Sequence, residues 1–267
     1  MATTRAARGN DRSSSGLRSA VHAAWPPLAV FVVALIAWEV GVRALKVPAG
    51  LIPAPSRVVN TLANQRSLFL ENLGTTLSEI VLGFVLGFAA GILIAVLVVY
   101  SPPIRRAIYP LVIVTQTIPI VALAPLLVII LGFGIASKVV IVALGVFFPL
   151  ALNGIAGLRS ADREHINLLR SFSASRVQIF RMVEAPAATP YLMTGVQIGL
   201  VYSVTGAVVA EWPGAESGIG ILMVTQYALS RTDIVLGAVV IVTVMAMLMF
   251  SLPRLVRRRL VPWEEAP

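Results

Sequence analysis

Long apolar segments alternate with shorter polar ones along the chain. A helix needs roughly 20 mostly apolar residues to cross the hydrocarbon core of a bilayer, and six segments meet this requirement. They are about Pro27–Ala44, Thr75–Tyr100, Ala107–Leu131, Ile135–Gly157, Pro190–Glu211 and Asp233–Pro253. The pattern therefore predicts an all-α membrane protein with six transmembrane helices.

The polar segments divide the chain further. Three prolines follow the first span, and a surface helix is expected from Ser56 to about Leu70. Only Gly132, Phe133 and Gly134 separate the third and fourth spans, which predicts a tight turn. The expected organisation is a disordered N-terminal tail (1–24), a first transmembrane helix with an external segment (25–74), a five-helix core that includes a polar loop at 158–188 (75–253), and a C-terminal tail (254–267).

Composition supports this class of protein. Hydrophobic residues make up 58% of the chain and charged residues only 12%, against roughly 25% charged in soluble domains. The chain has no cysteine, which excludes disulfides and thiolate metal sites. The two histidines, His22 and His165, lie beside different spans, so no metal site is expected.

The net charge of +9 has two possible explanations. Nucleic-acid binding would need a basic patch interleaved with aromatic residues, and the sequence has none. Membrane orientation explains the charge better, because Lys and Arg favour the cytoplasmic side. They gather in both tails, at Arg105 and Arg106, and in the loop after the fourth span. Both termini and that loop are therefore expected to be cytoplasmic.

The loop from Leu158 to Ala188 is amphipathic and too polar to cross a bilayer. Its five arginines are Arg159, Arg163, Arg170, Arg176 and Arg181. Ser175 and Gln178 fit a capping box, and the short helix that follows should end at Pro186, because the residue before a proline avoids the helical region.

Val177, Phe180 and Val183 recur at three-residue spacing in this loop and predict one apolar face. Two alternatives are open for that face. The helix could lie on lipid headgroups, or it could dock against a soluble partner and pass the partner's motion into the membrane.

The loop resembles the EAA signature of ATP-binding cassette importer permeases, which is Glu-Ala-Ala, three residues, Gly, nine residues and Ile-x-Leu-Pro. Asn167-Leu168-Leu169, Ser173 and Val183-Glu184-Ala185-Pro186 stand at the matching positions. The spacing is kept, but the first Glu and the Gly are replaced. A left-handed backbone at Ser173 would cost about 1–2 kcal/mol. The chain either tolerates both changes and couples normally, or it is the weaker half of an asymmetric pair with a second permease or is poorly coupled.

Other segments are similar to the nitrate, sulfonate and taurine branch of that family, over roughly Ile52 to Met249. They are Ala122–Leu126, Gly132–Lys138, Ala174–Arg176, Pro186–Pro190, Thr194-Gly195, Ala210-Glu211 and Gly218–Gly220. The resemblance implies the type I importer fold in a bacterial inner membrane. It also implies an ATPase subunit, a second permease chain in a homodimer or heterodimer, and an extracytoplasmic solute-binding protein.

The resemblance also implies functional residues. Coupling to the ATPase is expected at Asn167, Ser173, Ser175, Arg176, Val177, Phe180, Val183 and Pro186. Gln116, Gln197, Tyr202, Ser203 and Thr205 are expected either to line the translocation pathway or to form hydrogen bonds between helices. Glu211 is expected either to contact the binding protein or to mark the membrane interface. The solute would be an alkanesulfonate, taurine or nitrate; the alternative is a pyrimidine vitamin precursor or riboflavin.

No catalytic residue and no cofactor are expected in this chain. It lacks the GxxxxGK[ST] loop that cradles nucleotide phosphates, so ATP hydrolysis would belong to the partner. A stand-alone secondary transporter would instead show ionisable residues at bilayer depth and inverted repeats, and the sequence indicated neither.

Small and charged residues inside the spans suggest how the helices pack. Gly83, Gly87 and Gly91 repeat every four residues, as do Gly195 and Gly199, and this spacing lets helices approach closely in lipid. Glu39 and Arg43 are expected to neutralise each other on one face of the first span.

Overall fold

The apolar segments fold into helices in the computed structural model, which describes residues 12–260. The α-helices are α1 (Arg12–Ala44), α2 (Pro55–Asn64), α3 (Arg66–Tyr100), α4 (Pro102–Thr115), α5 (Ile120–Leu131), α6 (Ile135–Arg159), α7 (Arg163–Ser171), α8 (Arg176–Ile179), α9 (Ala185–Glu211), α10 (Ile219–Ala228) and α11 (Thr232–Leu260). A π-helical turn, Phe180–Glu184, joins α8 to α9. The described part of the chain is therefore all-α, as predicted.

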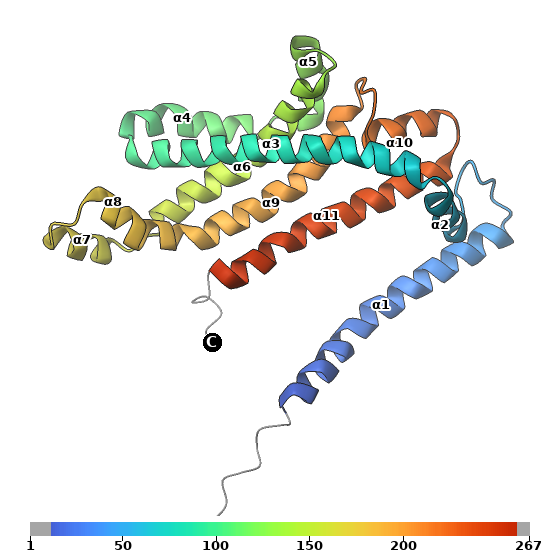
Figure 1. Ribbon diagram of the computed structural model, residues 1–267, viewed down its shortest axis with the longest axis horizontal. Coiled ribbons are helices and arrows are strands. Elements are labelled where there is room, and N and C mark those ends of the chain that lie inside the picture. The colour runs from blue at the N-terminus through green and yellow to red at the C-terminus, as the bar shows by residue number, and fades with distance from the viewer. Residues whose placement is uncertain (1–11, 261–267) are drawn as a thin grey trace, which may run out of the picture.

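Four of these helical elements are long and apolar enough to cross a membrane: α3, α6, α11 and the joined α8–α9. Helices α4 and α5 would make a fifth span together, but they meet at an angle of 105° and point in different directions in Figure 1. The predicted single helix Ala107–Leu131 is therefore wrong. Pro119 disfavours the helical region at the residue before it, and the chain turns there. The count of six spans stays a prediction.

Several other boundaries differ from the prediction. Helix α3 begins at Arg66, and the surface helix expected to reach Leu70 ends at Asn64 as α2. Helix α1 begins at Arg12, so the tail expected to be disordered is partly helical, because a formed helix extends more easily than a new one nucleates. At the other end, α11 continues to Leu260. Residues 1–11 and 261–267 lie outside the described part.

Helix α6 lies at the centre of the bundle, between α3 and α9, and α11 runs beside α9 (Figure 1). The core that joins the four helices consists of Ile80, Val142, Val146, Leu150, Val204, Ala207 and Met245. We call the end that holds α7 and α8 the loop end, and the end that holds α2 and α10 the α10 end.

Glycines bring the central helices together. A Cβ atom added at Gly83 or Gly87 of α3 would come within 2.5 Å of atoms of α6, and one added at Gly195 or Gly199 of α9 would come within 3.1 or 3.3 Å of α6. A side chain at Gly83 or Gly87 would not fit, because its Cβ atom would lie only 2.5 Å from atoms of α6. The predicted close helix packing is thus confirmed.

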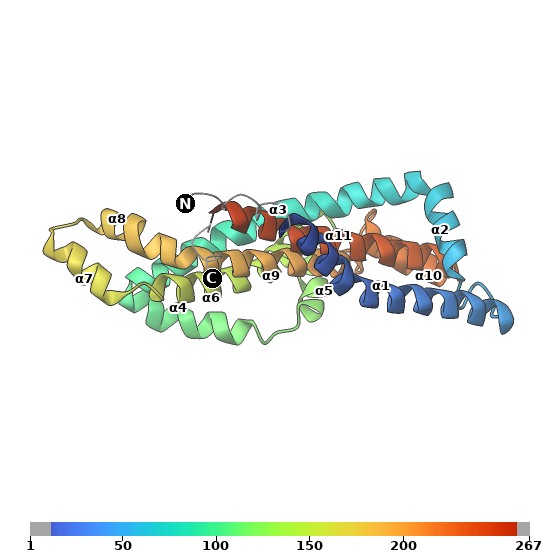
Figure 2. The same cartoon turned by 90° about the horizontal axis from the view of Figure 1, so that it is seen from below.

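Helix α1 is connected to the bundle through α2, which links it to α3 at the α10 end (Figure 2). The predicted pair is present: Arg43 Nε donates to Glu39 Oε1 at 2.6 Å. Glu39 also accepts hydrogen bonds from the amide of Ser56 at 3.0 Å and from its hydroxyl at 2.8 Å. A carboxylate at this position satisfies amides of the first turn of α2 and complements the helix dipole.

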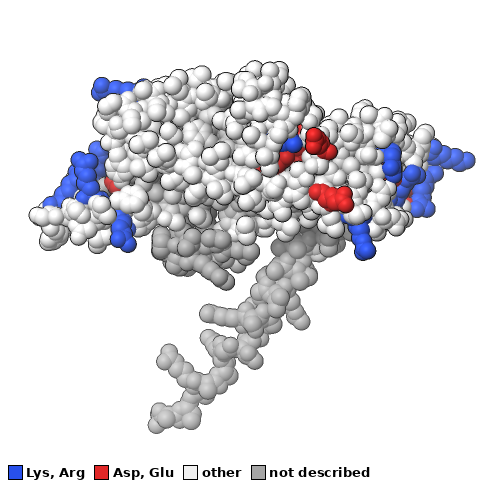
Figure 3. All heavy atoms as spheres, turned by 45° about the horizontal axis from the view of Figure 1, so that its top comes forward, with Lys and Arg blue, Asp and Glu red and all other residues white. Residues whose placement is uncertain are grey.

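Charged side chains gather toward the two ends of the molecule, and the broad middle of the face in Figure 3 is almost free of Lys and Arg. An uncharged band between two charged ends is typical of a protein that spans a bilayer.

Candidate functional site

The polar loop forms a helical hairpin of α7 and α8 at the loop end (Figure 1). Helix α7 begins after Asp162, whose carboxylate accepts hydrogen bonds from the amide of Glu164 and from Nδ1 of His165, both at 2.8 Å. These bonds, the first above all, hold the pKa of Asp162 below its usual value of 3.8. The carboxylate therefore stays ionised at neutral pH and caps α7.

Ser173 turns the chain from α7 to α8. Its φ is 59°, in the left-handed region. Around it the amide of Ser173 donates to the carbonyl of Arg170 at 2.9 Å, and the amide of Ala174 to that of Leu169 at 3.0 Å. The backbone of Ser173 thus has the left-handed conformation that favours glycine, the residue of the family motif at this position.

Helix α8 begins with the predicted capping box. The hydroxyl of Ser175 accepts from the amide of Gln178 at 3.3 Å, and the side chain of Gln178 accepts from the amide of Ser175 at 2.7 Å. The prediction that this helix ends at Pro186 is wrong. Pro186 lies in the first turn of α9, directly after the π-helical turn, whose wider backbone accommodates a residue without an amide hydrogen.

The loop exposes more apolar surface than its sequence suggested. Val177 is 65% exposed, whereas Phe180 and Val183, expected on the same face, are half-buried, and Ile179 is buried. The exposed apolar side chains of the loop are Leu168, Phe172, Val177 and Met182, with Phe172 at 75%. Asn167 and Arg176 are also exposed. We call the four exposed apolar side chains the docking face.

The expected pathway residues do not form one surface. Gln116 is exposed at the break between α4 and α5, and Gln197 Nε2 donates to the carbonyl of Phe250 at 3.4 Å. Tyr202 is half-exposed. Ser203 is fully buried, and its hydroxyl donates to the carbonyl of Leu200 at 2.7 Å. In the described structure its side chain faces the interior of the bundle and not an open surface.

Thr205 lies in a groove between α9 and α11 with a volume of about 380 Å³. The groove is lined by Val201, Val204, Thr205, Val242, Thr243, Ala246, Met247 and Phe250. Its polar groups are the two threonine hydroxyls, which already donate to carbonyls within their own helices. This surface is apolar and uncharged, and it carries one of the expected pathway residues.

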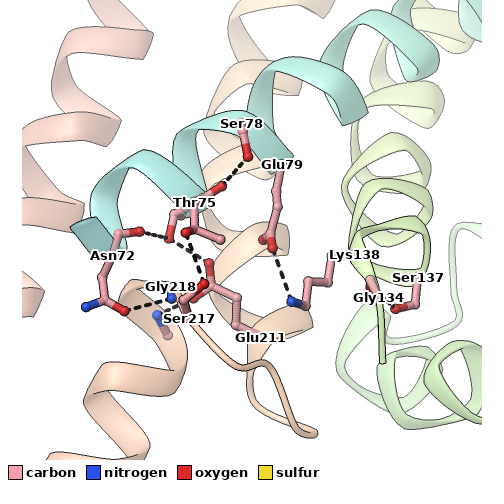
Figure 4. Close-up of polar contacts among 12 residues, drawn as sticks. Asn72, Thr75, Ser78, Glu79, Gly134, Ser137, Lys138, Glu211, Ser217 and Gly218 are labelled. Carbon is pink, nitrogen blue, oxygen red and sulfur yellow. Dashed lines mark hydrogen bonds and ion pairs between the residues drawn. The ribbon is translucent and has the colours of Figure 1, made fainter. Parts of the chain in front are cut away.

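Glu211 was expected to touch a binding protein, but its side chain is fully buried. Its carboxylate accepts hydrogen bonds from the hydroxyl of Thr76 at 2.6 Å and from the amide of Gly220 (Figure 4). The contact with a binding protein stays a prediction, and in the described structure the carboxylate contacts other residues of this chain. The carboxylate of Glu211, at the end of α9, links the start of α10 to α3, because it accepts from Gly220 of α10 and from Thr76 of α3.

Backbone amides just before and at the start of α10 also form hydrogen bonds with side chains of α3. The amide of Gly218 donates to Asn72 Oδ1 at 2.8 Å, and that of Ile219 to the hydroxyl of Thr76 at 2.9 Å. Gly218 has a φ of 132°, and a Cβ atom there would collide with the carboxylate of Glu211. Glycine at this position thus satisfies both the backbone conformation and the close approach of the carboxylate.

A second carboxylate, Glu79, is buried beside this junction. Glu79 has no exposed surface, and its Oε1 lies 3.4 Å from Nζ of Lys138, which is itself 7% exposed. Glu79 lies inside the predicted second span and was not expected there as an ionisable residue at bilayer depth. Asn72, Thr76 and Glu79 recur at spacings of three and four residues, and this polar stripe along an apolar helix was the available signal.

Comparison with known proteins identifies the family. Residues 83–262 match the family model described as the binding-protein-dependent transport system inner membrane component. The chain belongs to this family. It is thus a multi-pass inner-membrane permease component of an ATP-binding cassette importer.

The relatives transport different solutes, as their names state. The formylaminopyrimidine transport permease protein ThiX of Halalkalibacterium halodurans is 33% identical, with 91% of this chain and 98% of the relative covered. The riboflavin transport system permease protein RibX of Chloroflexus aurantiacus is 33% identical, with 95% of this chain and 96% of the relative covered. The taurine transport system permease protein TauC of Escherichia coli is 30% identical, with 85% of this chain and 84% of the relative covered. The similarity therefore extends beyond the sulfonate and taurine branch.

Solved structures confirm the fold. An inward-facing structure of the MetNI methionine ABC transporter aligns with a TM-score of 0.65 at 19% identity, covering 74% of this chain and 98% of the matched one. An amino acid ABC transporter solved with histidines gives a TM-score of 0.63 at 20% identity.

Proposed function

We propose that this chain lines the translocation pathway of its importer and couples to a partner ATPase through residues 158–188. The observation that carries this proposal is the continuity of α8 with α9. Arg176–Glu211 is one helical element of 36 residues, with Val177 and Met182 of the docking face near one end and the Glu211 junction at the other. A displacement of α8 would move α9 as a whole, because the π-helical turn joins the two without a break in the helix.

The exposed apolar side chains of the docking face favour contact with a soluble partner protein over exposure to water. Phe172 and Val177 expose most of their side chains, and burying such a side chain is worth about 1.5–3 kcal/mol. A short amphipathic helix gains this energy by lying in a groove of a partner protein. Exposed arginines of the same loop, such as Arg170 and Arg176, would surround that contact with positive charge.

For the solute we favour a small neutral heterocycle of the formylaminopyrimidine or riboflavin kind. The groove between α9 and α11 supports this class, because its lining residues include no Lys or Arg and a desolvated anion needs a compensating charge. Phe250 offers a ring and Thr205 and Thr243 offer hydroxyls to such a solute. The two relatives of 33% identity point the same way.

An alkanesulfonate, taurine or nitrate is the second candidate, supported by the taurine and sulfonate permeases among the relatives. In that case the binding protein would supply the charge that recognises the anion, and the permease would offer a neutral passage. The second permease chain, whether a copy of this one or a different chain, would complete the pathway in either case.

Reconstitution distinguishes these solutes. The chain is placed in liposomes with its partner ATPase and binding protein, and ATP-dependent uptake of a labelled aminopyrimidine and of labelled taurine is measured. We expect uptake of the aminopyrimidine, lowered by Thr205→Val combined with Thr243→Val, since valine keeps the shape of threonine and removes its hydroxyl. Uptake of taurine alone would refute the solute class. ATP-dependent uptake of neither compound, nor of any solute that the binding protein holds, would refute the importer.

A further inference from the structure

A cavity rich in arginine lies at the loop end, between the start of α4 and the junction of α6 with α7. Its volume is about 740 Å³, and its polar lining is dominated by Arg105, Arg106, Arg159 and Arg163. The first two come from α4 and the last two from the ends of α6 and α7, so the fold gathers them from separate segments. We call this site the arginine cavity. Part of its lining belongs to residues 158–188, but none of the four docking-face side chains lines it.

The four guanidinium groups have no carboxylate partner among the described residues. Two acids flank Arg163 in sequence. Asp162 is occupied by the amide of Glu164 and by His165, and the carboxylate of Glu164 forms no ion pair with the four arginines. Arg159 instead lies over the ring of Tyr109, with its guanidinium carbon 6.0 Å from the ring centroid, a geometry that orients the cation. Four cations that share one cavity repel one another, and an anion between them would remove that repulsion.

The remaining walls indicate what else the ligand contains. Val99, Pro110, Leu158 and Ile166 provide apolar surface next to the arginines. Helices α3 and α6 end here, at Tyr100 and Arg159, after long apolar stretches. The cavity therefore lies where apolar spans give way to charged residues, at the depth of lipid headgroups. A ligand with an anionic head and an apolar body matches both kinds of wall.

We propose that the arginine cavity binds the phosphate headgroup of an anionic phospholipid. Arginine forms paired hydrogen bonds with phosphate oxygens, and basic pockets between membrane helices bind anionic headgroups. The assignment to the cytoplasmic leaflet rests on the proposed orientation of the loop; the binding itself does not. A bound headgroup would brace the junction from which the loop starts, since Arg159 ends α6 and Arg163 begins α7.

Lipid binding to the purified full-length chain in detergent tests this proposal. The probes are short-chain phosphatidylglycerol and phosphatidylcholine, titrated and followed by native mass spectrometry. The variant is Arg105→Gln with Arg159→Gln. The matched control is Arg66→Gln with Arg231→Gln, which removes two exposed arginines outside the cavity. Each basic side chain near an anionic lipid contributes about a fivefold factor in affinity, so we expect the variant to bind phosphatidylglycerol about 30-fold more weakly and the control to bind like the original chain.

Three results would overturn the proposal: equal affinity of the original chain for both lipids, unchanged affinity in the cavity variant, or an equal loss in the control. Inorganic phosphate is added in a separate arm. Displacement of phosphatidylglycerol by millimolar phosphate would show that the cavity takes a soluble phosphate instead of a lipid. This measurement needs neither ATPase nor solute, so its outcome is independent of the uptake assay that tests the proposed function.

Discussion

Glu79, Lys138 and Glu211 come from three helices and meet in the interior of the bundle (Figure 4). Two carboxylates and one ammonium group share this space, and only Glu211 has hydrogen-bond partners for its carboxylate in the described structure. A buried ion pair contributes little net stability, but the loss of one partner leaves an uncompensated charge. Lys138 is therefore the residue on which the local charge balance depends.

Replacement of Lys138 by methionine tests this dependence. Lys138→Met should lower the free energy of unfolding by about 1–3 kcal/mol, the cost of a buried polar group left without a partner, because the carboxyl of Glu79 would lose its cationic neighbour. The double variant Lys138→Met with Glu79→Leu should recover much of that loss. Thermal unfolding in detergent measures both. If Lys138→Met unfolded at the same temperature as the unsubstituted chain, the Glu79–Lys138 pair would not contribute to stability.

Ser173 offers a prediction of the opposite sign. Its φ of 59° is unfavourable for a residue with a Cβ atom, so Ser173→Gly should stabilise the α7–α8 turn by about 1 kcal/mol after the greater flexibility of glycine in the unfolded chain is counted. Ser171→Gly, within α7, is the control and should destabilise the same loop. Amide hydrogen exchange of residues 163–180 would reveal either effect. Faster exchange in Ser173→Gly would contradict the account.

At the scale of elements, the α3–α6 contact depends on the absence of side chains. A Cβ atom at Gly87 would lie 2.5 Å from the carbonyl oxygen of Ala143 and 2.8 Å from Cβ of Val146, whereas one at Gly74, on the same helix, would meet nothing within 4 Å. The two glycines thus form a natural pair for comparison.

Gly87→Ala should force α3 away from α6 and destabilise the protein by about 1–3 kcal/mol, the usual range for an overpacked core. Gly74→Ala should be neutral or stabilising, because alanine is the better helix former by about 1 kcal/mol. Unfolding temperatures of the two purified variants provide the measurement. Equal temperatures would mean that α3 and α6 are not in the contact described.

The same scale shows what local sequence determines. The capping box at Ser175 and Gln178 and the glycine spacing depend on neighbours in sequence, and both were predictable. The left-handed backbone at Ser173 was considered only through the resemblance to the family motif, because serine itself does not favour it. The 105° bend between α4 and α5 and the continuity of α9 through Pro186 were not, since several backbone conformations satisfy those residues. The burial of Glu211 depends on α3 and α10, which no local pattern relates to it.

For the whole molecule, orientation is the first consequence of the proposed function. The chain has no cysteine, so single cysteines at Ser171, in the loop, and at Ser217, at the α10 end, can be labelled on intact cells with an impermeant thiol reagent. Both positions are exposed. Only the cysteine at position 217 should react, because the loop end is expected to face the cytoplasm. Labelling at position 171 would reverse the orientation and remove the basis for coupling.

Coupling through the loop is the central claim, and co-purification with the ATPase tests it most directly. Val177→Asp places a charge in the docking face, and Leu229→Asp places one on an equally exposed apolar side chain at the α10 end. We predict that Val177→Asp lowers both the amount of ATPase that co-purifies and solute uptake by at least about tenfold, the effect of 1.4 kcal/mol, while membrane insertion and the Leu229→Asp complex are unchanged. Undiminished ATPase binding and uptake in Val177→Asp would show that the loop is a passive surface element and would contradict the account.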